Sequence, residues 1–299
     1  MKSAGRFGRL TALLAVLGIG LAAAPGWARA CEPLAPGSSR IEFAGWSGPK
    51  LPVHVHKPKA GGAGSRILFV MHGVQRDGDR YRDEWRDLAE QHNLVIVVPT
   101  FGRKYFPTTE SYNFGNIIDK RGQRVPRELW SFSAIEPLFD EIVCRIAGNQ
   151  RGYALYGHSA GGQFVHRYVA FADAPRLEVA VAANSGWYTM PTDAAFPYGW
   201  GGDVAGLVVA EKAFQRPLTI LLGTADNDRN HPSLRKNQQA DRQGLTRFAR
   251  GHGFLAAAQE RAGKTVPLRW RIAYAEGIGH DNGGMAPFAV PYLTGAGGK

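Results

Sequence analysis

The sequence predicts an α/β fold in which helices cover both faces of a mostly parallel central sheet. Short apolar runs alternate with segments of helical periodicity, and a glycine-rich strand–turn–helix segment lies near the middle of the chain. Parallel neighbours need a crossover connection, so this alternation is typical of a parallel sheet. No Pro/Ser linker, charge block or internal repeat divides residues 31–299, so we expect them to form one domain.

The first 30 residues have the features of a secretory signal peptide. Three basic residues precede an apolar stretch over residues 10–24, which is shorter than a membrane span, and small residues at 28 and 30 form a cleavage site. We predict an exported protein, periplasmic or extracellular, that is cleaved after Ala30 and has no stable membrane insertion. Lipid attachment at Cys31 is the alternative, although Arg29 stands where a lipoprotein signal has a small residue.

Cys31 and Cys144 are the only cysteines. In an exported chain a pair of cysteines indicates a disulfide, which here would tie the new amino terminus to a predicted helix over residues 135–146. Two free thiols are the alternative.

The elements before this helix begin with two short antiparallel strands. An apolar run then predicts the first parallel strand, a helix with aromatic and aliphatic residues at helical spacing follows it, and a second buried strand ends at Pro99. A long irregular loop precedes the helix that carries Cys144. The predicted ranges are residues 41–43, 51–56, 66–71, 80–92, 94–98 and, for the loop, 101–125.

Five further elements follow the central strand–turn–helix, which consists of a strand over residues 152–156 and a helix over residues 163–171. Apolar runs predict strands, and a longer polar segment with helical spacing predicts one more helix. The residues between two of the strands form an insertion that is a candidate lid. These ranges are 177–183, 197–202 for the insertion, 218–222, 243–261 and 268–275.

The turn itself reads Gly157-His158-Ser159-Ala160-Gly161-Gly162, which contains Gly-x-Ser-x-Gly. Between a strand and a helix this motif is typical of a nucleophile elbow, where glycines are needed because the turn is strained and crowded. The helix amino terminus behind Ser159 also offers a free N–H and a positive dipole end. We predict Ser159 as a nucleophile. The alternative is a tight turn that happens to hold a serine.

A serine nucleophile needs a base and an acid, in chain order Ser, acid, His. Asp226 follows the strand over residues 218–222, and His280 lies on a Gly-rich loop after the last strand; among the nine histidines only His280 has this order and context. We predict that His280 accepts the proton of Ser159 and that Asp226 orients the imidazole. Asp228 and Asp281 remain alternatives for the acid.

Two backbone N–H groups are expected to form an oxyanion hole. One belongs to Ala160, directly after the nucleophile, and the other to the loop after the strand over residues 66–71. In this loop Val74 is the first choice and Gln75 the second.

These motifs together resemble the α/β-hydrolase superfamily, and the resemblance spans most of residues 31–299. It is closest to secreted polyhydroxybutyrate-depolymerase-like and feruloyl-esterase-like serine hydrolases. A related group of enzymes, similar to poly(aspartic acid) hydrolases, shares this architecture. The resemblance implies a Ser–Asp–His triad, no cofactor, and a small-molecule or polymeric acyl substrate. The motifs that carry it are Phe69-Val70-Met71-His72-Gly73, Gly157-His158-Ser159-Ala160-Gly161-Gly162, Gly223-Thr224-Ala225-Asp226 and Gly279-His280.

Loop residues supply the candidates for substrate contact. They are aromatic side chains on the predicted loops, together with one basic residue of the oxyanion loop; local packing is the alternative for the aromatic residues, and a solvated surface for the basic one. The candidates are Tyr112, Phe114, Trp187, Trp200 and Arg76.

Charge limits the partners. Residues 1–30 hold four of the 36 Lys and Arg and none of the 25 Asp and Glu, so residues 31–299 carry a formal charge of +7. This suits an anionic polymer or a negative cell surface, but the scattered basic residues argue against nucleic acid. No Cys or His pair has the spacing of metal ligands, so no metal site is predicted. The pattern says nothing about oligomeric state.

The sequence therefore predicts a secreted serine hydrolase that cleaves carboxylic esters, polyesters included, through an acyl-enzyme. An amide or peptide-bond hydrolase acting on an anionic polymer such as poly(aspartic acid) is the alternative. A non-catalytic binding protein with this fold is the third possibility.

Overall fold

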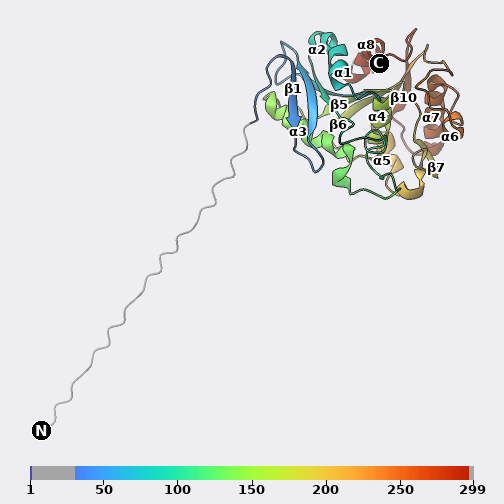
Figure 1. Ribbon diagram of the computed structural model, residues 1–299, viewed down its shortest axis with the longest axis horizontal. Helices are drawn as coiled ribbons and strands as arrows, with labels where there is room; N and C mark the ends of the chain where they lie inside the picture. The colour runs from blue at the N-terminus through green and yellow to red at the C-terminus, as the bar shows by residue number, and fades with distance from the viewer. Residues whose placement is uncertain (2–30, 296–299) are drawn as a thin grey trace. The chain divides into compact units, whose positions relative to one another are not determined.

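An eight-stranded sheet lies at the centre of the part of the chain that the structure, a computed structural model, describes: Met1 and residues 31–295 (Figure 1). The predicted signal peptide, apart from Met1, is outside the described residues. The eight strands are β1 (Gly37–Phe43), β2 (Leu51–Lys57), β3 (Arg66–Met71), β4 (Leu94–Pro99), β5 (Tyr153–His158), β6 (Leu177–Ala183), β9 (Leu218–Gly223) and β10 (Trp270–Ala275).

The strand order is β1-β2-β4-β3-β5-β6-β9-β10. β1 pairs antiparallel with β2, and β2 with β4, whereas every pair from β4 to β10 is parallel. The carboxyl ends of β3, β5, β9 and β10 therefore meet at one edge, where loops from distant parts of the sequence come together.

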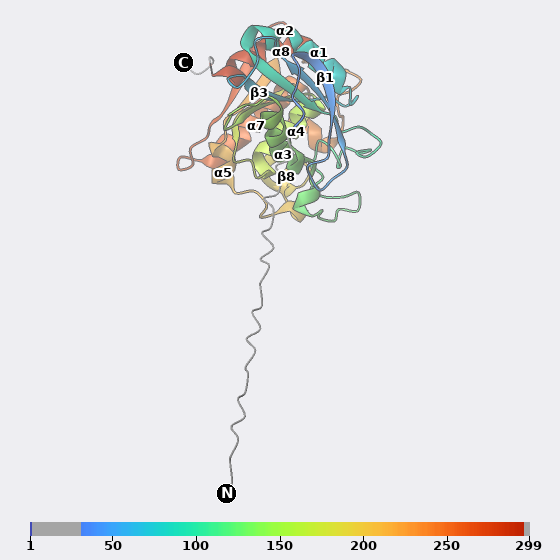
Figure 2. The ribbon, with the colours of Figure 1, turned by 90° about the vertical axis from the view of Figure 1, so that its left-hand side faces the viewer.

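Helices cover both faces of the sheet, so the predicted fold class is confirmed (Figures 1 and 2). α1, α2 and α8 lie on one side in both views, and α3, α4, α5 and α7 lie on the other. The helices are α1 (Gly78–Glu84), α2 (Arg86–His92), α3 (Ile135–Arg145), α4 (Ala160–Phe171), α5 (Ala210–Gln215), α6 (Gln238–Asp241), α7 (Arg247–Ala262) and α8 (Asn282–Thr294).

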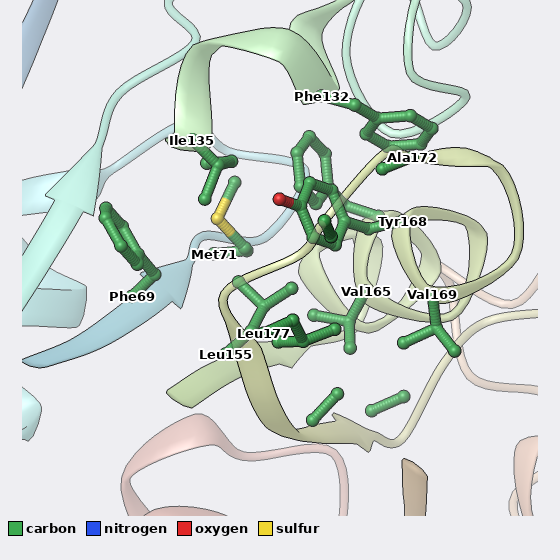
Figure 3. Close-up of a cluster of buried hydrophobic side chains, with 14 of the residues drawn as sticks. Phe69, Met71, Phe132, Ile135, Leu155, Val165, Tyr168, Val169, Ala172 and Leu177 are labelled. Atoms are coloured by element: carbon green, nitrogen blue, oxygen red, sulfur yellow. The ribbon is translucent and has the colours of Figure 1, made fainter. Parts of the chain in front are cut away.

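Burial follows the strand pattern that the sequence predicts. β4 and β5 are buried along their whole length, as expected of strands with helices on both faces. Figure 3 shows part of the larger core, where Phe69 and Met71 of β3 meet Ile135 of α3 and Val165 and Tyr168 of α4. This packing fixes α4 against the sheet, and the amino terminus of α4 is the point from which the site is built.

Several predicted elements differ in detail. The segment predicted as one helix over residues 80–92 forms two helices, because the helix is interrupted at Trp85, which caps the end of α1 and the start of α2. α7 begins at Arg247, where the Thr246 side chain accepts a hydrogen bond from the Ala249 N–H and caps the helix. α5, α6 and α8 were not predicted from the sequence. Residues 197–202 belong partly to a small separate pair of strands, β7 (Met190–Ala195) and β8 (Gly199–Gly201).

Cys31 and Cys144 form a disulfide with a Cα–Cα distance of 5.9 Å. The bond joins the first described residue of this domain to α3, 113 positions further along the chain. The Leu34 N–H also donates to the Arg145 carbonyl, so the segment after Cys31 is held to the same helix by its backbone.

Candidate active site

Ser159 occupies a sharp turn between β5 and α4, with φ 59° and ψ −115°. This left-handed backbone is strained for a residue with a side chain. The turn closes only because glycines surround it: a Cβ on Gly161 would overlap the Met71 carbonyl oxygen, and one on Gly157 would overlap the Gly161 carbonyl. The backbone therefore holds the Ser159 hydroxyl at the carboxyl edge of the sheet.

Three predicted side chains are in hydrogen-bond contact at this edge. Ser159 Oγ lies 3.0 Å from His280 Nε2, and His280 Nδ1 lies 2.7 Å from Asp226 Oδ2. Asp226 follows β9 and His280 follows β10; these two parallel strands are neighbours, which explains how residues 54 positions apart meet. The Nδ1–H donates to the carboxylate, which leaves Nε2 to accept the Ser159 proton.

Asp228, the alternative acid, is exposed, and its carboxylate accepts a hydrogen bond from the Asn230 N–H. Asp281, the other alternative, caps α8 by accepting from the Gly284 N–H. Neither contacts the imidazole of His280 within the described residues.

Asp226 has a second partner, Arg247, that the sequence did not reveal. Arg247 Nη1 donates to Asp226 Oδ1 at 2.9 Å, and both side chains are almost fully buried. Burial alone would raise the pKa of Asp226, but the hydrogen bond and charge of His280, with Arg247, outweigh it and lower the pKa. The carboxylate is thus ionised beside the imidazole that it orients. Arg247 stands in the first turn of α7, and only the tertiary fold brings it here.

Two further histidines lie against His280. The ring of His158 is 4.6 Å from that of His280, centroid to centroid, and the ring of His231 is 5.2 Å away. Burial lowers the pKa of both, and the charges of His280 and Arg247 lower them further. Both rings are therefore neutral neighbours of the base. Neither histidine was predicted as a site residue. His158 is next to Ser159 in the sequence, which could have indicated it, whereas His231 lies in a polar loop that gives no such signal.

The backbone N–H groups expected to bind an oxyanion lack partners. Ala160 is the first residue of α4, so its N–H has no intrahelical acceptor, and the N–H groups of Val74 and Gln75 have no acceptor among the described residues. Val74 and Gln75 follow β3, which pairs with β5 directly beside the elbow.

Arg76, which belongs to this loop, and Tyr112 anchor the loop to neighbouring backbone and do not line the cavities at Ser159, which corrects two predicted substrate contacts. The Arg76 guanidinium donates to the carbonyls of Phe101 and Thr108 and lies 4.2 Å above the Tyr112 ring. Tyr112 is fully buried and donates its hydroxyl to the His72 carbonyl at 2.7 Å. Through these bonds to the protein backbone, both residues hold the loop in place.

Comparisons with known proteins identify the family to which this chain belongs. Poly(aspartic acid) hydrolase-1 from Sphingomonas sp. KT-1 is similar at 42% sequence identity with a TM-score of 0.83, over 87% of this chain and 99% of that chain. A poly(3-hydroxybutyrate) depolymerase from Bordetella parapertussis is similar at 32% identity and a TM-score of 0.80, over 87% of this chain and 91% of that chain. This chain belongs to the α/β-hydrolase family.

An S-formylglutathione hydrolase from Agrobacterium tumefaciens shares the fold of this α/β hydrolase at 15% identity, with a TM-score of 0.55 over 88% of this chain and 97% of that chain. No family model and no curated protein matches the sequence. The relatives establish a hydrolytic enzyme.

Two cavities of this α/β hydrolase meet at Ser159. One, of about 340 Å³, is lined by His280, His231 and the oxyanion loop; the other, of about 270 Å³, is lined by Ala160, Gln163 and Trp187. Val74 and Ser233 line both. Ser159 therefore stands between two cavities, and only the larger is lined by His280.

The other predicted substrate contacts lie in or behind the smaller cavity. Trp187 lines it, and Phe114 packs edge-on against Trp187 without lining it. Trp200 is elsewhere: it is buried against Phe214 in the main core and lines neither cavity. Trp200 therefore serves local packing, which was the alternative to substrate contact.

Among the described residues, no group of His, Cys, Asp or Glu side chains has an arrangement that would hold a metal ion. The same residues include no helix that is long and apolar enough to cross a membrane.

Proposed function

We propose that this chain is an exported serine hydrolase that cleaves carboxylic acyl bonds through an acyl-enzyme on Ser159. The observation that carries the proposal is the continuous hydrogen-bond path from Ser159 through His280 to Asp226, with distances of 3.0 and 2.7 Å. Export rests on the predicted signal peptide and agrees with the disulfide. The expected first residue of the exported protein is Cys31.

The steps follow from these contacts. His280 Nε2 takes the Ser159 proton as Oγ attacks the carbonyl carbon, and Asp226 stabilises the imidazolium. The N–H groups of Ala160 and Val74 bind the oxyanion; we prefer Val74 to Gln75 because Val74 lines both cavities. His280 then gives its proton to the leaving group. Water, deprotonated by His280, attacks the acyl-enzyme and releases the acid and Ser159.

Replacing the nucleophile tests this proposal. Ser159→Ala should abolish turnover and covalent labelling by a fluorophosphonate, because no other described hydroxyl lies within hydrogen-bond distance of His280 Nε2. The fold should be unchanged by circular dichroism, since Ala retains the Cβ that the turn already accommodates. Ser233→Ala is the matched control, because Ser233 lines the same cavities without contacting His280. Wild-type labelling of the Ser159→Ala variant would refute the proposal.

Two substrate classes fit the acyl chemistry. A carboxylic ester, including a polyester, is the class that the sequence predicts, and the relative at 32% identity is a poly(3-hydroxybutyrate) depolymerase. An amide bond of an anionic polymer is the second class, and the relative at 42% identity is a poly(aspartic acid) hydrolase.

The charges around the smaller cavity favour the anionic polymer. Arg235 lines this cavity over the face of Trp187, and no Asp or Glu lines it. Behind the wall, the fully buried Arg167 donates to Asn113 and Gln163 and has no carboxylate partner among the described residues. Arg235 therefore presents a positive group to this space, and no carboxylate of the cavity lining offsets it.

Salt dependence separates the two classes. If the substrate is poly(aspartate), its kcat/KM should fall steeply between 0.1 and 1 M salt, as the screening length shrinks from about 10 Å to about 3 Å. Arg235→Glu should reproduce the high-salt loss at low salt. Exposed Arg86→Gln, on α2, is the control and should have little effect. Rapid turnover of a neutral ester that ignores salt and Arg235→Glu, with poor turnover of poly(aspartate), would assign the enzyme to the ester class.

A further inference from the structure

His231 stands at the wall of the larger cavity, with its ring against that of His280. It lies on the loop between β9 and α6, is partly exposed, and lines the same cavity as Ser159 and His280. The path from Ser159 to Asp226 does not use it.

The contacts of His231 Nδ1 determine where the ring carries its proton. Nδ1 lies 3.2 Å from Arg247 Nη2, 3.2 Å from the Ser233 backbone nitrogen and 3.1 Å from Ser233 Oγ, a hydroxyl that can donate to it. A guanidinium and a backbone N–H can only donate, so Nδ1 presents a lone pair to both. Burial and then the charge of Arg247 lower the pKa of His231, so the ring is neutral. Its proton is therefore on Nε2.

Nε2 has no hydrogen-bond partner among the described residues. Nδ1 faces Arg247 and Ser233, and the ring forms part of the cavity wall, so the N–H on the opposite side of the ring is free to bond to a molecule in that cavity. Arg247 thus touches both Asp226 and His231, and the guanidinium that binds the triad carboxylate also fixes the tautomer of this donor.

The role of His280 identifies which part of a substrate occupies this space. The general acid must reach the leaving group, and of the two cavities that meet at Ser159 only the larger is lined by His280. The larger cavity is therefore the leaving-group side, and the smaller one holds the acyl group.

Resting on the proposed acyl-transfer function, we propose that His231 is a specificity-determining residue whose Nε2–H donates to an acceptor oxygen in the leaving group. A leaving group that continues as a polymer carries such an oxygen in its next carbonyl or carboxylate, whereas a simple alcohol or amine does not. His231 therefore selects substrates in which the chain extends beyond the cleaved bond. This holds for a polyester and for an anionic polyamide alike.

Matched substrates with one acyl group and two leaving groups test the proposal. One pair is ethyl 3-hydroxybutyrate and the linear dimer of 3-hydroxybutyrate; the other is the N-ethylamide of aspartate and the aspartate dimer. His231→Phe removes the donor and keeps a ring of similar size. For the dimer that the wild type cleaves, this variant should lower kcat/KM by about 10-fold, equivalent to about 1.4 kcal/mol. The kcat/KM for the short substrate of the same pair should be unchanged. His231→Gln, which retains an N–H donor, should restore part of the loss.

The outcomes distinguish failure of the proposed function from failure of the role of His231. If the wild type cleaves no member of either pair and Ser159 is not labelled, the proposed function fails. If the wild type cleaves one pair and His231→Phe lowers both members equally or neither, the proposed function stands and the role of His231 is refuted. Circular dichroism and fluorophosphonate labelling of His231→Phe show whether the fold and triad are intact. A wild-type rate of labelling is expected, because the probe has no extended leaving group.

Discussion

Asp226 contacts both His280 and Arg247. One carboxylate oxygen accepts from His280 and the other from Arg247, so both are used and the group cannot rotate without breaking a charged hydrogen bond. Removing one member of a buried charge pair leaves the other uncompensated, so replacing Asp226 would also leave the buried Arg247 guanidinium without its carboxylate.

Asp226→Asn should therefore lower turnover by about 10⁴-fold, the loss seen when the corresponding aspartate of a serine protease is replaced and the imidazole takes the wrong tautomer. Asp228→Asn, the control two residues away, should cost less than about 3-fold, because its exposed carboxylate contacts only the loop backbone. Steady-state kcat measured at several pH values checks both. Reversed effects would assign the acid to Asp228.

At this scale the sequence predicted the residues that a motif or the chain order identifies, and missed those that only folding brings together. Ser159 stands in a recognisable turn, and Asp226 and His280 follow strands in the expected order. Arg247 has no such signal, because nothing in an amphipathic helix marks a basic residue of the first turn as buried. Trp200 was misplaced for the opposite reason: an aromatic residue in a loop-like sequence gives no indication of whether it faces the core or a cavity.

At the scale of elements, the crossing of α4 over β3 decides where Ser159 stands. Gly161 approaches the Met71 carbonyl so closely that no side chain fits between the helix and the strand. The obstacle is backbone on both sides, so neither partner can move aside by changing a rotamer.

Gly161→Ala should destabilise the enzyme by about 3 kcal/mol, at the upper end of the usual cost of overpacking, and should also lower labelling of Ser159 because the elbow must shift. Gly64→Ala is the matched control, since a Cβ there meets nothing within 4 Å. Urea denaturation gives the free energy of unfolding for both variants. Equal stability of the two would contradict the close crossing.

The strands were predicted more accurately than the helices. Runs of buried apolar residues identified β3, β4, β6 and β9 to within about a residue, because both faces of these strands are covered. α8 was missed: it contains Pro287 and Pro291, which argue against a helix in the sequence, and it lacks a polar face of regular spacing. Its place against the sheet, where Met285, Ala289 and Leu293 are buried, makes it helical.

For the whole molecule, the sequence predicted the layered architecture because alternation of strands and helices leaves few topologies open. The packing of helices on the sheet also buries several histidines, and burial favours their neutral form. Burial lowers the pKa of His72 to about 3, and it lowers those of His158 and His166 well below the ordinary value.

This burial predicts a loss of stability in mild acid. The unfolded chain binds protons at these positions below about pH 6.5 and the folded chain does not, so the free energy of unfolding falls as pH falls. Where the unfolded histidine is fully protonated and the folded one is not, each group changes the free energy of unfolding by about 1.4 kcal/mol per pH unit, and the three together by about 4 kcal/mol per pH unit. Urea denaturation between pH 7.5 and 5.5 checks this, with His166→Gln expected to reduce the slope and exposed His252→Gln serving as control. Constant stability over this range would contradict it.

The bond between Cys31 and Cys144 closes a covalent ring around the first part of the domain. The exposed residues Arg103, Lys104 and Tyr105 project from a loop inside that ring. A protease that cuts the chain there opens the ring without dividing the molecule, because the two pieces remain joined through sulfur. The protein can therefore be nicked at this exposed loop and remain one covalent molecule until a reductant breaks the disulfide.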